Sequence, residues 1–385
     1  MTDQTPAIPK GWKMTTLGEM LGIKNGKSRP DDGETYPVYG GNGVLGYSDE
    51  YNIDEKIIIV GRVGAYCGSI FLENEKFWLS DNALGVLPKE NSNIDFLYYL
   101  LKKTNLNKQA IGGAQPLLTQ GVINQIEVLV PEDKEEQRAI AAVLASLDDK
   151  IELLREQNKV LDATAQAVFK EWFVIFNFPD ATGKMIDSEL GEIPEGWRVD
   201  SLSKIAVFLN GLALQKFPPE STTEYLPVIK IRELSAGVSA QTDRASARLD
   251  KKYIVEDGDV LFSWSGSLVV DIWKYGKGAL NQHLFKVTSE DFPKWFYFHW
   301  TKEHLASFQQ TAIAKAVTMG HIQRHHLDDA LVVIPDEKFL KIADKVFAPM
   351  LDKFINNNSQ IQALSILRDA LLSKLMKGEI RVAGV

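Results

Sequence analysis

Two long stretches of the chain carry apolar side chains at alternating spacings of three and four residues. The first stretch runs from Ile140 to Trp172 and the second from Ala343 to Leu375. This spacing places the apolar side chains on one face of a helix, as in the seam of a coiled coil. We therefore predict two long helices that pair through their seams. The predicted helix and partner interface consists of Leu147, Ile151, Leu154, Asn158, Leu161, Phe354, Ile361, Leu364 and Leu371.

Polar residues interrupt both seams, with Asn158 in the first and Asn357 in the second. Pro349 lies inside the second pattern, and because proline removes a backbone donor we expect it to kink this helix or to mark its true start. The alternative to pairing is that each helix belongs to the core of a separate domain. The matched rhythm and length of the two patterns favour pairing.

The segments before the two helical patterns combine short apolar runs with glycine-rich turns, which is typical of strands mixed with shorter helices. We predict strands at residues 55–60, 68–72, 126–130, 226–231, 259–263 and 283–287, and helices at residues 93–103 and 295–308. Each half of the chain thus reads as a mixed α/β domain followed by one long helix. The predicted boundaries are 1–134 and 179–337 for the domains, and 135–178 and 338–380 for the helices.

The chain also contains an internal repeat. Residues 8–26 and 193–211 share Ile, Pro, Gly, Trp, Leu, Asn and Gly at matching positions, and residues 126–133 resemble residues 330–337. The ends of the two halves repeat, whereas their middles differ in length and share little sequence. This pattern indicates a constant frame that carries two different inserts. A duplicated enzyme would instead be expected to repeat its chemical residues.

Composition narrows the class of protein. No run of 18 apolar residues is present, the first ten residues lack an apolar signal core, and Cys67 is the only cysteine. We expect a cytoplasmic protein without disulfides, without a membrane span and without a cysteine-based metal site. The formal net charge of −8 argues against a nucleic-acid partner. Basic residues nevertheless gather in the two inserts, while acidic residues are dense at residues 132–136.

Apparent catalytic motifs lack the context that they need. Residues 41–46 match GxGxxG, but no helix pattern follows, as a dinucleotide fingerprint requires. His321 and His325 have the spacing of a zinc pair without the accompanying glutamate, so a polar face is the simpler interpretation. We therefore expect no catalytic residue and no metal site.

The inserts contain residue types suited to reading DNA. Arg62 lies between glycines at a strand end, where its guanidinium could fork onto guanine, and Gln115 is a natural partner for adenine. Glycine in the loop around Asn42 lets the backbone approach a surface closely. The alternative is that such residues simply form turns, but their concentration in both inserts favours binding. The full predicted set is Gly41, Asn42, Gly43, Arg62, Gln115, Lys230, Arg232, Ser263, Trp264, Ser265, Gln282, His283 and His321.

Taken together, the motifs resemble those of the specificity subunits of type I restriction-modification systems. The first half contains IP-x-GW, YPVYGGNGVLGY, VGRVGAYCGSIF, FWLSDNALGV and QPLLTQGVINQIEVLVP. The second contains a further IP-x-GW, LPVIKIREL, GDVLFSWSGS, LNQHLFKV, TMGHIQRHHL and RDALLSKLMKGEI. One departure is the start of the second long helix, which lacks the pair formed by Glu136 and Gln137 in the first half. This leaves the local geometry of that helix start open.

The resemblance implies an α+β fold in which two antiparallel coiled-coil helices separate two target-recognition domains related by a pseudo-twofold repeat. Each domain would read one half of a split sequence in double-stranded DNA, and the helices would dock two methyltransferase subunits, which two restriction subunits can join. S-adenosylmethionine, ATP and magnesium would be bound by those partners, so this chain would be a non-catalytic subunit that binds no cofactor itself. Two alternatives stay open at this point, a coiled-coil scaffold without DNA specificity and a divergent DNA methyltransferase.

Overall fold

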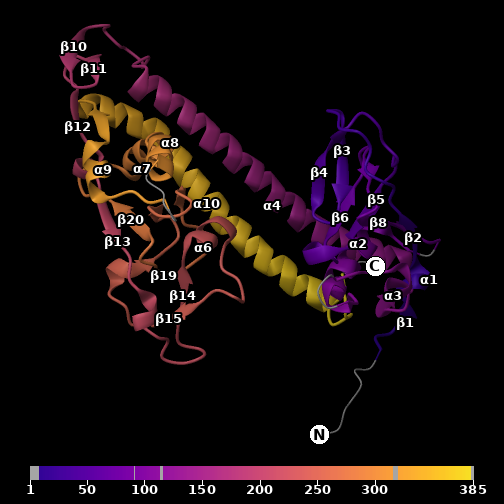
Figure 1. Ribbon diagram of the computed structural model, residues 1–385. Coiled ribbons are helices and arrows are strands. Elements are labelled where there is room, and N and C mark those ends of the chain that lie inside the picture. The colour runs from indigo at the N-terminus through magenta and orange to yellow at the C-terminus, as the bar shows by residue number, and fades with distance from the viewer. Residues whose placement is uncertain (1–7, 91, 113–115, 315–319, 383–385) are drawn as a thin grey trace. The chain divides into compact units, whose positions relative to one another are not determined.

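The computed structural model describes residues 8–90, 92–112, 116–314 and 320–382, which fold into two compact units (Figure 1). Unit 1 consists of the chain up to Ile151 together with Leu364 onward, and unit 2 consists of Glu152–Ala363. Both unit boundaries fall inside the two long helices. Each long helix therefore contributes one part to each unit.

Unit 1 is built on a four-stranded antiparallel sheet in the order β2-β8-β5-β6. A smaller sheet has the order β4-β3-β7, and β1 pairs with β9. The bounds are β1 Trp12–Thr16, β2 Leu21–Asn25, β3 Tyr36–Gly40, β4 Gly43–Ser48, β5 Ile57–Gly61, β6 Ile70–Glu73, β7 Trp78–Leu79, β8 Ala83–Pro88, β9 Glu127–Pro131, α1 Leu17–Met20, α2 Ile94–Thr104 and α3 Gln120–Asn124. Every residue of β5 is buried, which explains its uninterrupted apolar sequence.

Unit 2 has a four-stranded antiparallel sheet in the order β13-β20-β17-β18. A second sheet has the order β15-β14-β19-β16, while β12 pairs with β21 and β10 with β11. The bounds are β10 Met185–Ser188, β11 Gly191–Pro194, β12 Arg198–Ser201, β13 Val207–Asn210, β14 Leu226–Ile229, β15 Arg244–Ala245, β16 Ile254–Val255, β17 Val260–Ser263, β18 Val270–Ile272, β19 Gly278–Leu280, β20 Leu284–Thr288, β21 Leu331–Ile334, α5 Leu202–Ile205, α6 Ile231–Ala236, α7 Lys294–Glu303, α8 Leu305–Ala314 and α9 Arg324–Asp329.

The structural repeat extends through the middle of each unit, where we expected two different inserts. Strands β2, β8, β5 and β6 have the same order and antiparallel pairing as β13, β20, β17 and β18. In both units a further strand, β3 or β14, pairs in parallel with β7 or β19. The two middles therefore share a sheet framework despite their unlike sequences. They differ after β3 and β14, where unit 1 has a tight turn to β4 and unit 2 has α6 before β15.

The long helices are α4 (Lys134–Phe169), which continues as a π-helix over Lys170–Val174, and α10 (Glu337–Leu375). In unit 2, Asn158 contacts Asn357 while the Phe169 and Phe347 rings lie 6.1 Å apart, so the helices run antiparallel. In unit 1, Arg368 Nη1 donates to Asp148 Oδ1 at 2.8 Å. The predicted pairing of the two seams is confirmed, and all the seam residues are buried or partly buried.

Helix α10 begins at Glu337 and passes through Pro349, so of the two expectations for this proline, the one that it marks the helix start is excluded. Two other local expectations were wrong. The predicted helix at residues 295–308 is two helices, α7 and α8, which meet at His304. Strand β14 ends at Ile229, because Ile231 already begins helix α6.

The start of α10 differs from that of α4 in chemistry. In unit 1 the buried Glu136 accepts hydrogen bonds from Trp12 Nε1 at 3.3 Å and from Arg381 Nε at 2.8 Å. In unit 2, buried Phe339 lies in the corresponding first turn and packs against Trp197, with ring centroids 5.2 Å apart. An aromatic contact thus takes the place of a charged one at the start of α10.

Candidate nucleic-acid interface

The repeated Asn-Gly pair marks the same point in both units, directly after the first strand of the main sheet. A Cβ added to Gly26 would lie 1.8 Å from Ser80 O, and one added to Gly211 would lie 2.2 Å from Asn281 O. Only glycine allows this close backbone approach. The repeat of this glycine is therefore structural, and it aligns Asn25 with Asn210 at the end of β2 and β13.

In unit 1, backbone hydrogen bonds gather three chain segments at one end of the main sheet. Arg62 N donates to Asn82 O at 3.0 Å, and Leu118 N donates to Arg62 O at 2.9 Å. The turn between β3 and β4 joins them, because Ser69 Oγ donates to Gly41 O and a Cβ on Gly41 would lie 3.5 Å from Val63 O. We call this end of unit 1 edge 1.

Edge 1 contains most of the residues predicted for the first half. Gly41 and Asn42 form the turn between β3 and β4, Gly43 begins β4, and Arg62 follows β5. Gly41 and Gly43 are buried, whereas Asn42 is exposed and Arg62 is partly buried. The predicted Gln115 lies outside the described residues.

In unit 2, the same hydrogen bonds recur with different side chains. Trp264 N donates to His283 O at 3.4 Å, and Ile322 N donates to Trp264 O at 2.9 Å. This places Trp264 where unit 1 has Arg62, and His283 where unit 1 has Asn82. We call this end of unit 2 edge 2.

Edge 2 brings five predicted residues together, namely Trp264, Ser265, Gln282, His283 and His321. Ser265 Oγ and His283 Nδ1 are 2.9 Å apart, and Gln282 Nε2 and His283 Nε2 are 3.4 Å apart. Ser265 also forms an antiparallel bridge with His321, whose side chain is exposed. Ser265 is buried and supports His283 from below, so the surface of edge 2 combines the polar side chains of Gln282, His283 and His321 with the Trp264 ring.

Ser263 lies behind this surface, where it is fully buried. Its hydroxyl donates to Ser267 O at 2.6 Å and accepts from Val269 N at 2.8 Å. These bonds close the turn after β17. The hydroxyl has no exposed surface with which to contact a ligand.

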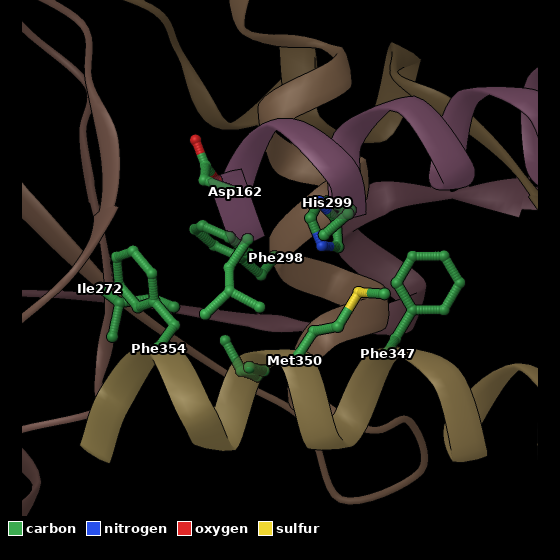
Figure 2. Close-up of a pocket in the computed structure, with 10 residues that line it drawn as sticks. Asp162, Ile272, Phe298, His299, Phe347, Met350 and Phe354 are labelled. Atoms are coloured by element: carbon green, nitrogen blue, oxygen red, sulfur yellow. The ribbon is translucent and has the colours of Figure 1, made fainter. Parts of the chain in front are cut away.

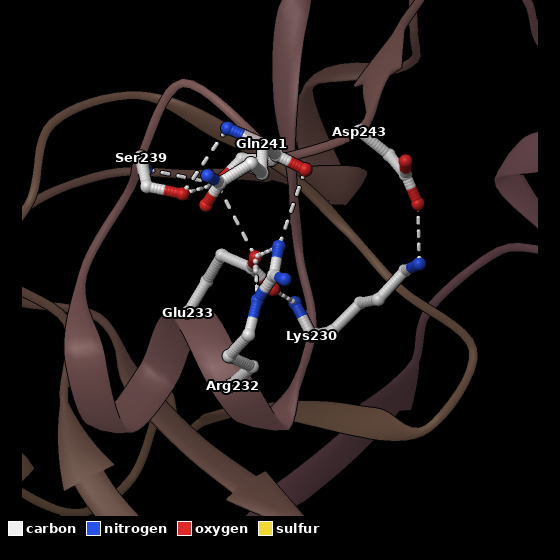
Figure 3. A network of polar contacts seen from close by, with 7 residues as sticks. Lys230, Arg232, Glu233, Ser239, Gln241 and Asp243 are labelled. Atoms are coloured by element: carbon white, nitrogen blue, oxygen red, sulfur yellow. Dashed lines mark hydrogen bonds and ion pairs between the residues drawn. The ribbon is translucent and has the colours of Figure 1, made fainter. Parts of the chain in front are cut away.

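Lys230 and Arg232 form internal ion pairs in unit 2 (Figure 3). Arg232 Nη2 lies 2.7 Å from Oε1 of Glu233, a carboxylate whose side chain is only 1% exposed. Lys230 donates to Asp243, and this hydrogen bond lowers the pKa of Asp243 below its ordinary value. Each of these two cations thus already has a partner in the described part of the chain. A role for them in binding DNA stays a prediction.

Comparison with known families identifies the frame that carries the two edges. The sequence model of the type I restriction modification DNA specificity domain matches residues 9–163 and 194–366. These two segments contain both edges and most of each long helix. The chain belongs to the family of type I restriction-modification specificity subunits.

Similar proteins support this family assignment along nearly the whole chain. The MjaIX specificity subunit of Methanocaldococcus jannaschii is 26% identical over 97% of this chain and 95% of its own length. The EcoprrI specificity subunit of Escherichia coli is 32% identical over 40% of each chain. A crystal structure of the type I S subunit from M. genitalium has a TM-score of 0.64 at 15% identity, covering 97% of this chain and 98% of that one, and so shares the fold.

Within this type I specificity chain, several edge residues were missed from the sequence. Asn25 and Asn210 accept side-chain hydrogen bonds at the two edges, and Gln120 and Arg324 begin the short helices α3 and α9 beside them. The repeated asparagine was a usable signal, since it lies in the matched segments at residues 8–26 and 193–211. The positions of Gln120 and Arg324 could not be matched from sequence, because the residues differ in type.

A small apolar cavity lies away from edge 2, where α4, α7 and α10 meet in unit 2 (Figure 2). It encloses about 20 Å³, and buried His299 faces it from α7. Burial lowers the pKa of His299 to about 3, so the imidazole is neutral at physiological pH. Among the described residues no cluster of three or more potential metal ligands occurs, and no described helix is both long and apolar enough to cross a membrane.

Proposed function

We propose that this chain is the DNA-reading subunit of a type I restriction-modification complex, with each unit reading one half of a bipartite sequence. The observation that carries the proposal is the duplication of one edge with two different sets of side chains. Edge 1 offers Arg62 and Asn42, while edge 2 offers Gln282 and His283. Two copies of one frame with unlike surfaces suit two different half-sites, because base edges in the major groove are distinguished by their donors and acceptors.

The paired helices α4 and α10 would dock two methyltransferase subunits, which two restriction subunits can join. S-adenosylmethionine, ATP and magnesium would then be bound by those partners, and this chain would act without a catalytic residue of its own. Its formal net charge of −8 supports this division of labour. An acidic chain attracts phosphates weakly by itself, so basic partners would supply much of the affinity for DNA.

The proposal is tested by comparing DNA binding by the purified chain and by its complex with two methyltransferase subunits. The chain alone should bind weakly and with little selectivity, whereas the complex should select one sequence and lose affinity steeply as salt rises. Calorimetry with S-adenosylmethionine should show heat with the complex and none with the chain. Tight selective binding by the chain alone, or no selectivity in the complex, would contradict the proposal.

A further inference from the structure

The asparagine side chain at the end of the first sheet strand has a different partner at each edge. At edge 1, Gln120 Nε2 donates to Asn25 Oδ1 at 3.1 Å. At edge 2, Trp264 Nε1 donates to Asn210 Oδ1 at 3.0 Å. The equivalent asparagine oxygens therefore receive their hydrogen bonds from different elements. The donor lies on the short helix α3 in unit 1 and directly after β17 in unit 2.

This exchange of partners can be followed because the surrounding backbone is the same. Gly64 N donates to Pro116 O at 3.0 Å in unit 1, and Gly266 N donates to Gly320 O at 2.9 Å in unit 2. Four residues beyond each of these carbonyl groups, a short helix begins, with Gln120 as the first residue of α3 and Arg324 as the first residue of α9. Gln120 and Arg324 are therefore equivalent, as are Arg62 and Trp264.

Each edge consequently presents one arginine whose side chain bonds no other described residue. At edge 1 this is Arg62, whose Nε is shielded from solvent and has no hydrogen-bond partner. At edge 2 it is Arg324, whose side chain is exposed and forms no hydrogen bond or ion pair within the described part of the chain. In unit 1 the side chain bonded to the asparagine is on the short helix and the unpaired arginine follows the strand. In unit 2 these two positions are reversed.

Arg324 lies at a cavity of about 290 Å³, which Asn210, Trp264, Phe285, His321, Ile322 and Gln323 also line. The rings of Trp264 and Phe285 form one wall, with centroids 6.0 Å apart. Because Trp264 is held by Asn210 and by Gln282 O at 3.1 Å, this wall is fixed. A recessed, largely apolar wall suits the edges of bases in a groove better than it suits the charged phosphate backbone.

We propose that Arg324 is a specificity-determining residue of unit 2, and that it contacts the major-groove edge of a guanine through both arms of its guanidinium. The inference rests on the proposed function. Arg62 would play the same part in unit 1, but it follows strand β5, whereas Arg324 begins helix α9. Moving the free arginine between the strand end and the helix start lets one fold read guanine at two different places relative to its frame.

The test uses the chain in complex with its methyltransferase subunits and a library of DNA targets with every base pair varied in both half-sites. Arg324→Lys keeps the charge and loses the two-armed contact. It should reduce discrimination at one G·C pair of one half-site by about 5- to 150-fold and leave the other half-site unchanged. Arg198→Lys is the matched control, because Arg198 is an exposed arginine of unit 2 that pairs with Asp200 at 2.9 Å.

Two outcomes would overturn the inference. If Arg324 contacts a phosphate, Arg324→Lys will retain affinity, and Arg324→Ala will weaken all sequences alike and reduce the salt slope by about one. Unchanged discrimination together with unchanged affinity and salt slope in both variants would show that the residue makes no contact. Thermal unfolding of each variant separates these results from misfolding. Selection of a bipartite sequence by the wild-type complex shows that the proposed function holds even where this inference fails.

Discussion

Arg62 and Arg232 look alike in sequence, since both are arginines at the end of an apolar run in an insert. The structure separates them. Arg62 bonds no described residue through its side chain, whereas Arg232 compensates the buried carboxylate of Glu233. Sequence patterns could place both residues near a surface, but they could not show which guanidinium is already paired, because Glu233 becomes buried only through tertiary folding.

Replacing Arg62 with alanine should weaken or relax recognition at one half-site only. A two-armed contact to a base is worth about 1–3 kcal/mol, so discrimination at one base pair should fall by that amount. Lys56→Ala is a suitable control, because Lys56 pairs with Asp95 at 2.6 Å elsewhere in unit 1. Selection of methylated sites from a randomised library measures the effect, and an equal change in both half-sites would contradict it.

Replacing Arg232 with alanine should instead lower the stability of unit 2. Glu233 keeps hydrogen bonds from Lys230 N and Thr242 Oγ1 but loses its cation, which should cost about 1–2 kcal/mol of the free energy of unfolding. Arg248→Ala removes only an exposed pair with Glu224 and should cost less than about 0.5 kcal/mol. Chemical denaturation compares the two variants. Equal stabilities would show that the Glu233 carboxylate does not depend on Arg232.

His299 should make unit 2 sensitive to acid. Burial, with a smaller effect of Lys302, lowers its pKa from 6.5 to about 3. Below about pH 6.5, His299 is protonated in the unfolded chain but stays neutral in the folded unit. The free energy of unfolding therefore falls as the pH drops from about 6.5 towards 3. In His299→Phe this loss should be smaller, by up to about 1.4 kcal/mol per pH unit. The pKa of His304 is also lowered, but His304 is present in both proteins and its effect cancels. Superimposable unfolding profiles between pH 7 and 5 would refute the assignment.

At the scale of elements, a polar layer interrupts the helix pair in unit 2. Asn357 Nδ2 donates to Asn158 Oδ1 at 2.9 Å, and Asn158 Nδ2 donates to Asn358 Oδ1 at 3.0 Å. Asn158 and Asn357 are buried in the seam, and Asn357 Oδ1 has no partner. Polar residues in such a seam favour one register at some cost in stability.

A double-mutant cycle tests this layer. Asn158→Leu alone leaves the buried Asn357 amide with only its longer hydrogen bond to Gln157 Oε1 at 3.4 Å and should destabilise unit 2 by about 1–3 kcal/mol. Asn158→Leu combined with Asn357→Leu removes both buried amides and should recover at least that loss. Denaturant unfolding of the four proteins gives the coupling energy. Additive losses would show that the two asparagines do not act together.

The long helices were predictable because their apolar seam residues repeat over many turns. A single polar residue such as Asn158 does not hide a repeat of that length. Local breaks were harder to predict. His304 separates α7 from α8 without a proline or glycine, and Pro349 is accommodated within α10. The common order of the two main sheets was also missed, because burial fixes only the apolar character of each strand and not its residue types. Arg62 and Trp264 differ in residue type, and only their matching backbone hydrogen bonds show that they occupy equivalent positions.

At the scale of the whole chain, duplication explains the main features of the sequence. The repeated segments carry residues required by the frame, such as Gly26 and Gly211, where a side chain would collide with the neighbouring backbone. The unmatched segments carry the polar residues of edges 1 and 2. The sequence therefore revealed which parts are shared and which are free to differ, but not how the free parts correspond to one another.

We expect this chain to direct a methyltransferase to one bipartite DNA sequence. The most direct measurement is methylome sequencing of cells that carry the methyltransferase subunits with this chain or without it. We expect a single split sequence to be methylated, with both halves specified, and this methylation to disappear when the chain is absent. Methylation of the same sites without the chain, or of one undivided sequence, would contradict the account.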